Sequence, residues 1–109
     1  MRAKPVAPRA QARRDVEEAL AYYLSEGAGV AALGFIDALE RAYIQIGRHP
    51  ATGSPRYAYE LNLPGLRSWP LTRYPYLIFY VERSDLIDVW RVLHQKRDIP
   101  GWIQEPEDI

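Results

Sequence analysis

The sequence of 109 residues contains no cysteine, which excludes disulfides, zinc–thiolate sites and thiol catalysis. It also has no apolar run near the roughly 20 residues that a membrane-spanning helix needs. The positively charged N-terminal stretch is not followed by the hydrophobic core of a secretory signal. We therefore expect a cytoplasmic protein that does not associate with a membrane.

An excess of one charge is also missing, because 14 Lys and Arg residues balance 14 Asp and Glu residues. This argues against indiscriminate nucleic-acid binding, and we expect no direct sequence-specific binding either. Three of the acids, Glu105, Glu107 and Asp108, lie in the last few positions. We predict one domain over residues 1–103 and an acidic tail over residues 104–109, which either is solvated or shields a basic surface.

Histidine is scarce as well. His49 and His94 are the two present, they stand far apart, and the acids around them are scattered. This matches no metal-ligand spacing, so we expect neither a metal nor another cofactor. His49 precedes a proline at the expected end of a helix, where an imidazole favours the helix dipole.

Three strands are predicted in the C-terminal half of the chain, over residues 66–71, 76–82 and 86–94. Each is rich in aromatic or branched apolar residues and ends at a turn signal. Pro75 blocks a helix at the first junction, and a polar turn follows Glu82 at the second. The pattern indicates an antiparallel meander.

Two helices precede the strands, over residues 9–25 and 30–48, each with an apolar stripe at three- and four-residue steps. Gly27 fits a left-handed cap after the first helix, and the short link predicts an antiparallel hairpin. Gly34 is expected to let the first helix approach closely.

The remaining segments are short. Pro5 and Pro8 predict a brief N-terminal edge strand, and residues 51–64 are expected to be a loop with a brief strand at 61–63. A last helical turn is predicted at Trp102 and Ile103.

The resulting fold class is α+β, with a short N-terminal edge strand and a helical hairpin packed on a three- to four-stranded antiparallel sheet. Strict alternation in the last strand puts one set of residues on one face and a second set on the other. The first set is Ile87, Val89, Arg91 and Leu93, and the second is Asp88, Trp90, Val92 and His94. Both faces of the sheet are apolar, and the helices can cover only one. We therefore expect a partner chain on the second face, and poor solubility without it.

Several motifs resemble the ParE branch of the ParE/RelE superfamily of bacterial type II toxin–antitoxin toxins. The resemblance covers residues 5–98, and its most specific part is the closing run from Arg91 to Asp98, which is similar to the "RVLHGRRD" ending of ParE-like toxins with Gln95-Lys96 in place of Gly-Arg. The other matching positions are Pro8, Ala10, Asp15-Val16, Tyr22-Tyr23, Phe35, Leu39, His49-Pro50, Gly53, Leu66-Arg67 and the run from Tyr76 to Tyr80.

The resemblance implies a helical hairpin on a curved antiparallel sheet, and a cognate antitoxin whose C-terminal segment wraps the toxin in a hetero-oligomer. ParE-like toxins poison DNA gyrase, whereas RelE-like relatives are ribosome-dependent mRNA endoribonucleases. The leading hypothesis is a ParE-like toxin that acts by protein binding on gyrase. The alternatives are a RelE-like ribonuclease and a degenerate toxin that is retained as an antitoxin-binding module.

A metal-independent ribonuclease needs a base, an acid and cations on the phosphate. The candidates are Arg67, Arg91 and His94, with further cations at Arg73, Lys96 and Arg97. The chain has neither the dense basic patch nor the C-terminal Tyr or His of RelE-like ribonucleases.

Each candidate also has a structural alternative. His94 is either catalytic or a structural histidine whose ring bonds a backbone carbonyl, and Arg91 either contacts a ligand or pairs with a nearby carboxylate. Trp69 is either a stacking platform for bases or a packing residue, and Trp90 is also interpreted as packing. The candidate contact residues for the target or the antitoxin are Arg67, Trp69, Arg73, Tyr80, Trp90, Arg91, His94 and Arg97.

Overall fold

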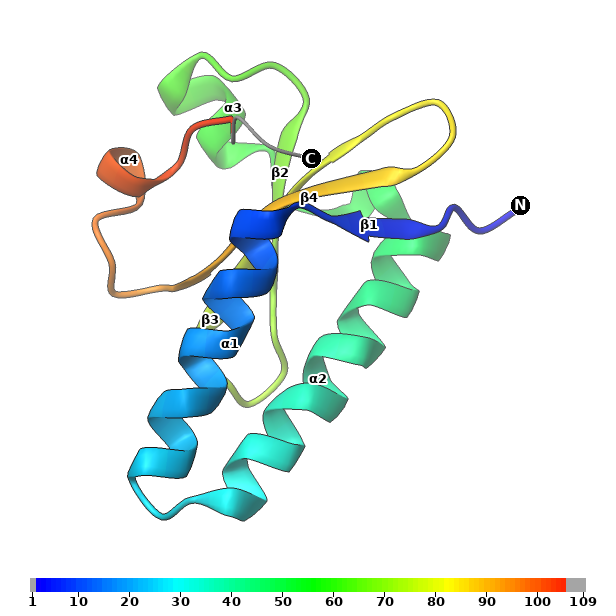
Figure 1. The fold of residues 1–109 in the computed structure, drawn as a ribbon. Coiled ribbons are helices and arrows are strands. Elements are labelled where there is room, and N and C mark those ends of the chain that lie inside the picture. Colours follow the sequence, from blue (N-terminus) through cyan, green and yellow to red (C-terminus); the bar gives the residue numbers. More distant parts are fainter. Residues whose placement is uncertain (1, 106–109) are drawn as a thin grey trace.

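Two long helices lie against one face of a four-stranded sheet in the computed structural model, which describes residues 2–105 (Figure 1). The elements in chain order are β1 (Val6–Pro8), α1 (Ala10–Ser25), α2 (Gly29–Arg48), the 3-10 helix η1 (Pro50–Thr52), α3 (Arg56–Leu61), β2 (Leu66–Pro70), β3 (Tyr76–Glu82), β4 (Ile87–His94) and α4 (Ile99–Trp102). The α+β class, the edge strand and the helical hairpin are confirmed.

The helical hairpin forms because both helices bury an apolar stripe on the sheet. Phe35, Leu39 and Ile46 of α2 are buried in one core with strand residues such as Ile78 and Val89. Gly27 adopts a φ of +69° after α1, as its predicted capping role requires.

Gly34 in α2 has a different neighbour from the one expected. A Cβ there would collide with the hydroxyl of Tyr74, which donates a hydrogen bond of 2.9 Å to the Ala31 carbonyl. The glycine therefore makes room for the β2–β3 turn, and the prediction that it admits α1 is wrong.

The sheet has the order β1-β4-β3-β2. β3 pairs antiparallel with both neighbours, but β1 pairs parallel with β4, placing Val6 opposite Ile87. The sheet is thus mixed. A parallel pair is possible here because a long stretch of chain separates β1 from β4, whereas a short hairpin would require antiparallel strands. At the other edge Ser54 and Ser68 exchange two backbone hydrogen bonds of 2.9 Å, which covers β2.

A β-bulge at Trp90 changes which residues of β4 share a face. Tyr80 lies opposite Val89 and Phe79 lies opposite Arg91, so that Trp90 is the extra residue. Val92 therefore joins Ile87 and Val89 in the core under the helices, while Trp90 and Leu93 belong to a second core. The strict alternation expected from the sequence is wrong beyond Val89, because one inserted residue inverts the pattern.

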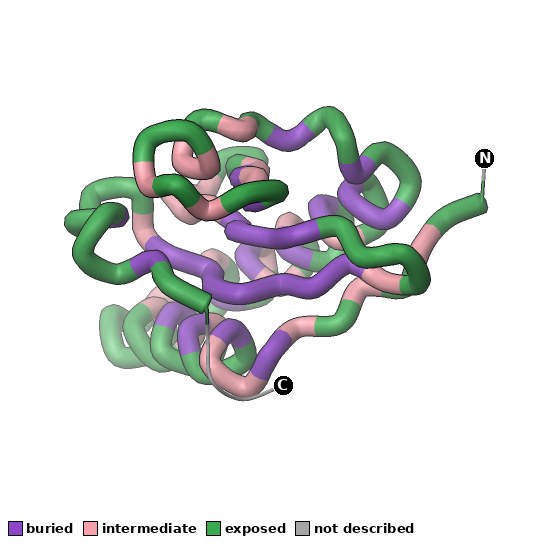
Figure 2. Tube along the Cα trace, turned by 90° about the horizontal axis from the view of Figure 1, so that it is seen from above, coloured by how far each residue is buried: buried purple, intermediate pink, exposed green. Residues whose placement is uncertain are grey.

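The second face of the sheet is covered by the chain itself. Leu66, Phe79, Val81, Trp90 and Leu93 are buried there with Ile99 and Ile103, and α3 packs against this core through Tyr57, Ala58 and Leu61. Figure 2 shows the buried residues running along the central strands. The prediction that a partner chain must cover this face is therefore wrong.

Residues 51–64, expected to be a loop, contain most of η1 and all of α3. The brief strand predicted at 61–63 is wrong, because Leu61 ends α3 and Asn62 caps it with a φ of +54°. The predicted helical turn near Trp102 is present as α4.

Candidate functional site

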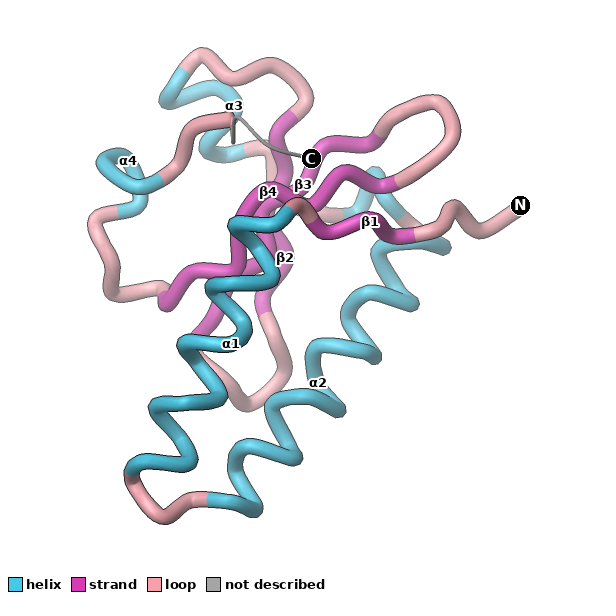
Figure 3. The backbone as a smooth tube through the Cα atoms, viewed as in Figure 1, coloured by secondary structure: helices cyan, strands magenta, loops and turns pink. Residues whose placement is uncertain are grey.

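The second half of β4 has an open edge because β1 is so short. β1 pairs with Ile87, Asp88 and Val89, and the Arg9 N–H makes a last backbone bond of 2.9 Å to the Val89 carbonyl. The chain then enters α1 directly (Figure 3). From Trp90 to His94, no strand of the described chain pairs with this side of β4.

A carboxylate from α1 takes the place of the missing strand. Asp15 accepts a hydrogen bond of 3.0 Å from the Val92 N–H and two of 2.8 Å from the Arg91 guanidinium. The exposed fractions of Asp15 and Arg91 are 6% and 8%. Arg91 therefore serves as a strut, but its partner is Asp15, far away in sequence, and not one of the nearby acids.

A groove of about 700 Å³ lies beside this edge, between α1 and the end of β4. Glu18, Tyr22 and Tyr23 form part of its α1 wall, and Tyr76 and His94 form part of the strand wall. Lys96 and Arg97 also line it and are exposed. The groove thus combines an aromatic interior with an acidic wall and a basic rim.

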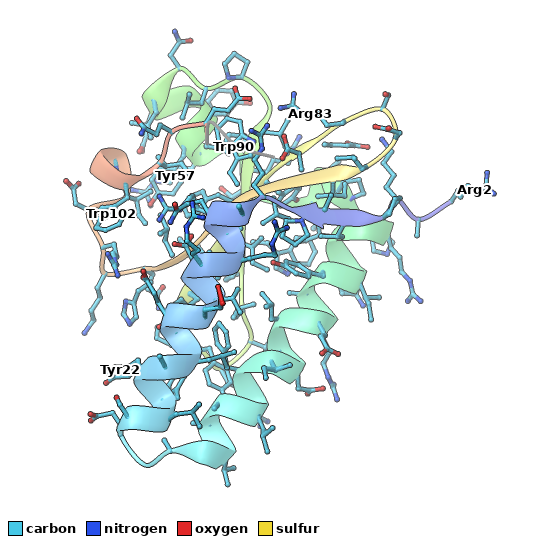
Figure 4. All side chains as sticks on the ribbon, in the orientation of Figure 1. Arg2, Tyr22, Tyr57, Arg83, Trp90 and Trp102 are labelled. Atoms are coloured by element: carbon cyan, nitrogen blue, oxygen red, sulfur yellow. The ribbon has the colours of Figure 1, made fainter. Side chains whose placement is uncertain are left out.

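Its aromatic side chains are in contact with one another. The Tyr22 and Tyr23 rings are 5.5 Å apart, and the Tyr76 ring is 5.2 Å from both Phe35 and His94. Burial raises the pKa of Tyr23 and of Tyr76, so both phenols stay neutral hydrogen-bonding groups. Tyr22 is 58% exposed and projects from the lower part of α1 in Figure 4. Such a wall offers apolar contact and polar tips to a peptide.

His94 is half-buried at the strand end. Its Nδ1 accepts a hydrogen bond of 3.1 Å from the Lys96 N–H, and its ring meets Tyr76 edge-on. The ring thus has two structural contacts, but its backbone partner is an N–H and not the expected carbonyl.

The three proposed ribonuclease residues do not converge. Arg67 lies on β2, separated from β4 by β3, and donates a hydrogen bond of 2.7 Å to the Gly53 carbonyl. Two strand spacings amount to about 10 Å. Arg91 is held by Asp15, so His94 is the one member of the trio that lines the groove.

The other predicted contact residues fall into three environments. Tyr80 has no exposed surface and donates a hydrogen bond of 2.7 Å to the Pro50 carbonyl, and Trp90 is 4% exposed in the second core. Neither side chain can touch a partner in this conformation, because the chain covers both faces of the sheet. Trp69 is half-buried against the helix-side core. Arg73 is exposed in a turn, and Arg97 is exposed 4.2 Å above the Trp102 ring.

Two important residues were missed as site residues. Asp15 stands at a helical step from Ala12 and Ala19 in an otherwise apolar stripe, and this buried position was the available signal for a charged partner. Tyr22 is adjacent to Tyr23, but Tyr22 is exposed and Tyr23 is half-buried. This difference depends on how α1 meets the strand.

Among residues 2–105, no three His, Asp or Glu side chains gather as a metal site would require. None of the helices in this part of the chain combines the length and apolar character needed to cross a bilayer.

Comparisons with known proteins point in one direction. Residues 6–99 match the family model described as the ParE toxin of the type II toxin–antitoxin system parDE. A solved structure described as the chromosomal ParDE TA system from P. aeruginosa superposes with a TM-score of 0.69 at 16% sequence identity, covering 84% of this chain and 96% of that one. At this identity, the similarity concerns the fold. A search of curated proteins finds no match.

Proposed function

Because this chain belongs to the ParE toxin family of type II toxin–antitoxin systems, we propose that it poisons DNA gyrase in the cytoplasm by protein binding and is neutralised by a cognate antitoxin. The gyrase target rests on the family resemblance. The binding mechanism is supported by one structural observation, the separation of Arg67, Arg91 and His94. His94 shares the groove with Lys96 and Arg97, but Arg67 and Arg91 are bonded to Gly53 and Asp15 and do not line it, so the predicted trio does not form one RNA-cleaving site.

The groove between α1 and β4 is the proposed docking site of the antitoxin segment. Its size of about 700 Å³ falls within the range of ligand-binding clefts. Its tyrosines suit an apolar peptide side chain, while Glu18 on one wall and Lys96 with Arg97 on the other offer charge contacts of both signs. A segment with apolar residues and both charges fits this lining better than a polyanion does.

The test of the target is a pair of assays on purified, antitoxin-free protein. Gyrase supercoiling and DNA cleavage are measured beside cleavage of mRNA on programmed ribosomes. We expect trapped gyrase–DNA cleavage complexes and intact mRNA. Codon-phased mRNA cuts with unaffected gyrase would contradict the proposal and support a ribonuclease. No effect in either assay would favour a degenerate toxin that only binds its antitoxin.

The groove is tested with two matched substitutions of exposed tyrosines. Tyr22 lines the groove and is 58% exposed, whereas Tyr59 on α3 is 80% exposed and lies outside it. Tyr22→Asp should weaken binding of the co-expressed cognate antitoxin by about tenfold or more, because it puts a charge into an aromatic contact. Tyr59→Asp should leave the affinity unchanged. Equal effects of the two substitutions in a titration would place the antitoxin elsewhere.

A further inference from the structure

Two arginines share one carboxylate at the other half of β4. Arg9 donates two hydrogen bonds of 2.9 Å to the two Asp88 carboxylate oxygens. Arg83 donates two more, of 2.9 and 3.2 Å, to Asp88 Oδ2. Asp88 thus holds both arginines through four hydrogen bonds.

The acidic end of the chain supplies the second negative charge. Glu105 Oε2 lies 3.2 Å from Arg9 Nη2 and 4.0 Å from Arg83 Nη2. The Glu105 side chain is 57% exposed, so its carboxylate is held at the surface and not enclosed. At Glu105 this contact agrees with the interpretation that the acidic tail shields basic side chains. Glu107 and Asp108, the other two acids of the tail, lie outside the described residues.

The segment that leads to Glu105 carries two apolar anchors. Ile99 and Ile103 are 3% and 5% exposed in the second core, beside Trp90 and Leu93. Figure 4 shows Trp102 on α4 and Trp90 on the same upper side of the view. We call residues 99–105 the strap. It combines two apolar side chains with a carboxylate two residues after the second one.

We propose that the strap occupies, within the same chain, a docking face for an acidic and apolar peptide segment of a partner protein. The two sockets of Ile99 and Ile103 and the Arg9–Arg83 pair form this face. A nucleic-acid phosphate could meet the arginines, but it has no side chains for the apolar sockets. This face adjoins the groove at Leu93, but Arg9 and Arg83 are not among the residues that line the groove. The inference holds whether or not gyrase is the target.

Because the strap already occupies this face, a partner segment must compete with it and needs a higher concentration to bind. A tethered segment acts at an effective concentration in the millimolar range, so a free segment of the same sequence binds weakly while the strap is seated. Weakening the contact of Glu105 with the arginines should lower the concentration that a partner segment needs.

The first experiment measures hydrogen exchange of the full chain carrying Glu105→Lys. The matched control is Glu40→Lys, which makes the same change of charge at an exposed position of α2. The amides of Trp102 and Ile103 bond to the Asp98 and Ile99 carbonyls, and they should exchange about fivefold faster or more in Glu105→Lys. They should be unchanged in Glu40→Lys. Equal exchange in both variants would overturn the role of Glu105.

The second experiment measures binding of a fluorescent peptide with the sequence of residues 99–109 to these full-length proteins. Its affinity should be about tenfold higher for Glu105→Lys than for Glu40→Lys, since global charge attraction is the same in both. A peptide with Glu105→Gln should bind more weakly. Affinity that does not differ between the two proteins would overturn the proposal. Equal binding by a short single-stranded DNA that displaces the peptide would instead assign the arginines to phosphate.

Discussion

The two halves of β4 close their outer edge in different ways. From Ile87 to Val89 the neighbour is a strand, and backbone pairs with backbone. From Trp90 to His94 the neighbour is a helix, and the Asp15 carboxylate stands in for one strand group at Val92. A neighbouring strand forms backbone hydrogen bonds with every second residue of β4, whereas the Asp15 carboxylate bonds the β4 backbone at Val92 alone. The second half therefore keeps a groove, whereas β1 occupies the edge of the first half.

Each half also contains a carboxylate bonded to arginine, and the two clusters differ in exposure. Asp88 is shared by Arg9 and by Arg83, whose side chain is 44% exposed. Asp15 holds Arg91 alone, and the two side chains are 5% and 10% exposed. A second arginine remains to adjust to a change at Asp88. At Arg91 the contacts left without Asp15 are a hydrogen bond of 3.2 Å to the Trp102 carbonyl and the Trp102 ring, so the Asp15–Arg91 ion pair should matter more for stability.

The largest effect should come from Asp15→Ala. It leaves the buried Arg91 guanidinium without its carboxylate and the Val92 N–H without an acceptor. Breaking a buried pair from one side costs about 3–5 kcal/mol, so we expect that loss of unfolding free energy in urea titrations followed by circular dichroism.

The double variant Asp15→Ala with Arg91→Met provides the control. It removes both charges and should recover part of the loss, because the uncompensated charge is gone. A loss below about 1 kcal/mol in the single variant would show that water reaches Arg91, and the contrast with the Asp88 cluster would fail.

A smaller effect is expected from Asp88→Asn. Burial alone would raise the pKa of Asp88, but the hydrogen bonds from Arg9 and Arg83 outweigh it and hold the pKa below the ordinary value of 3.8. The substitution weakens charge-assisted hydrogen bonds, at a cost of about 2 kcal/mol near neutral pH.

The pH dependence of this cost has a definite sign. A carboxyl whose pKa is lowered by folding contributes stability above its unfolded pKa and loses it as the pH falls through the folded pKa. The difference in unfolding free energy between wild type and Asp88→Asn should thus be constant above about pH 5. It should shrink below 3.8. A difference that grows on acidification would contradict the assignment.

The features that could be predicted from the sequence are those encoded by local pattern. The stripes of α1 and α2 repeat over many turns, and Gly27 marks the end of α1 through its backbone freedom. The strand bounds 76–82 agree with the structure for the same reason, since aromatic and branched residues between turn signals favour extended backbone.

The features that were missed depend on contacts between distant residues. Nothing local distinguishes Trp90 as a bulge, because the apolar residues Val89 and Val92 on either side of it suit both faces of a buried strand. The pairing of Asp15 with Arg91 joins positions 76 residues apart. The six residues of α3 are too short for a periodic signal, although the left-handed Asn62 that ends the helix is a residue type that favours such caps.

The smallest effect should come from His94→Ala, at the open end of the groove. The substitution removes the imidazole, which accepts a hydrogen bond from the Lys96 N–H and contacts the Tyr76 ring edge-on. Because this site is half-buried, water can replace the lost acceptor, and we expect a loss of about 1 kcal/mol in the same urea titration. Such a variant stays folded, so its effect in growth-arrest and mRNA-cleavage assays reports on function. Retained toxicity would agree with a binding mechanism in which no imidazole chemistry takes part. Abolished RNA cleavage by a folded variant would make His94 catalytic, and the groove would then be an active site and not only a docking surface.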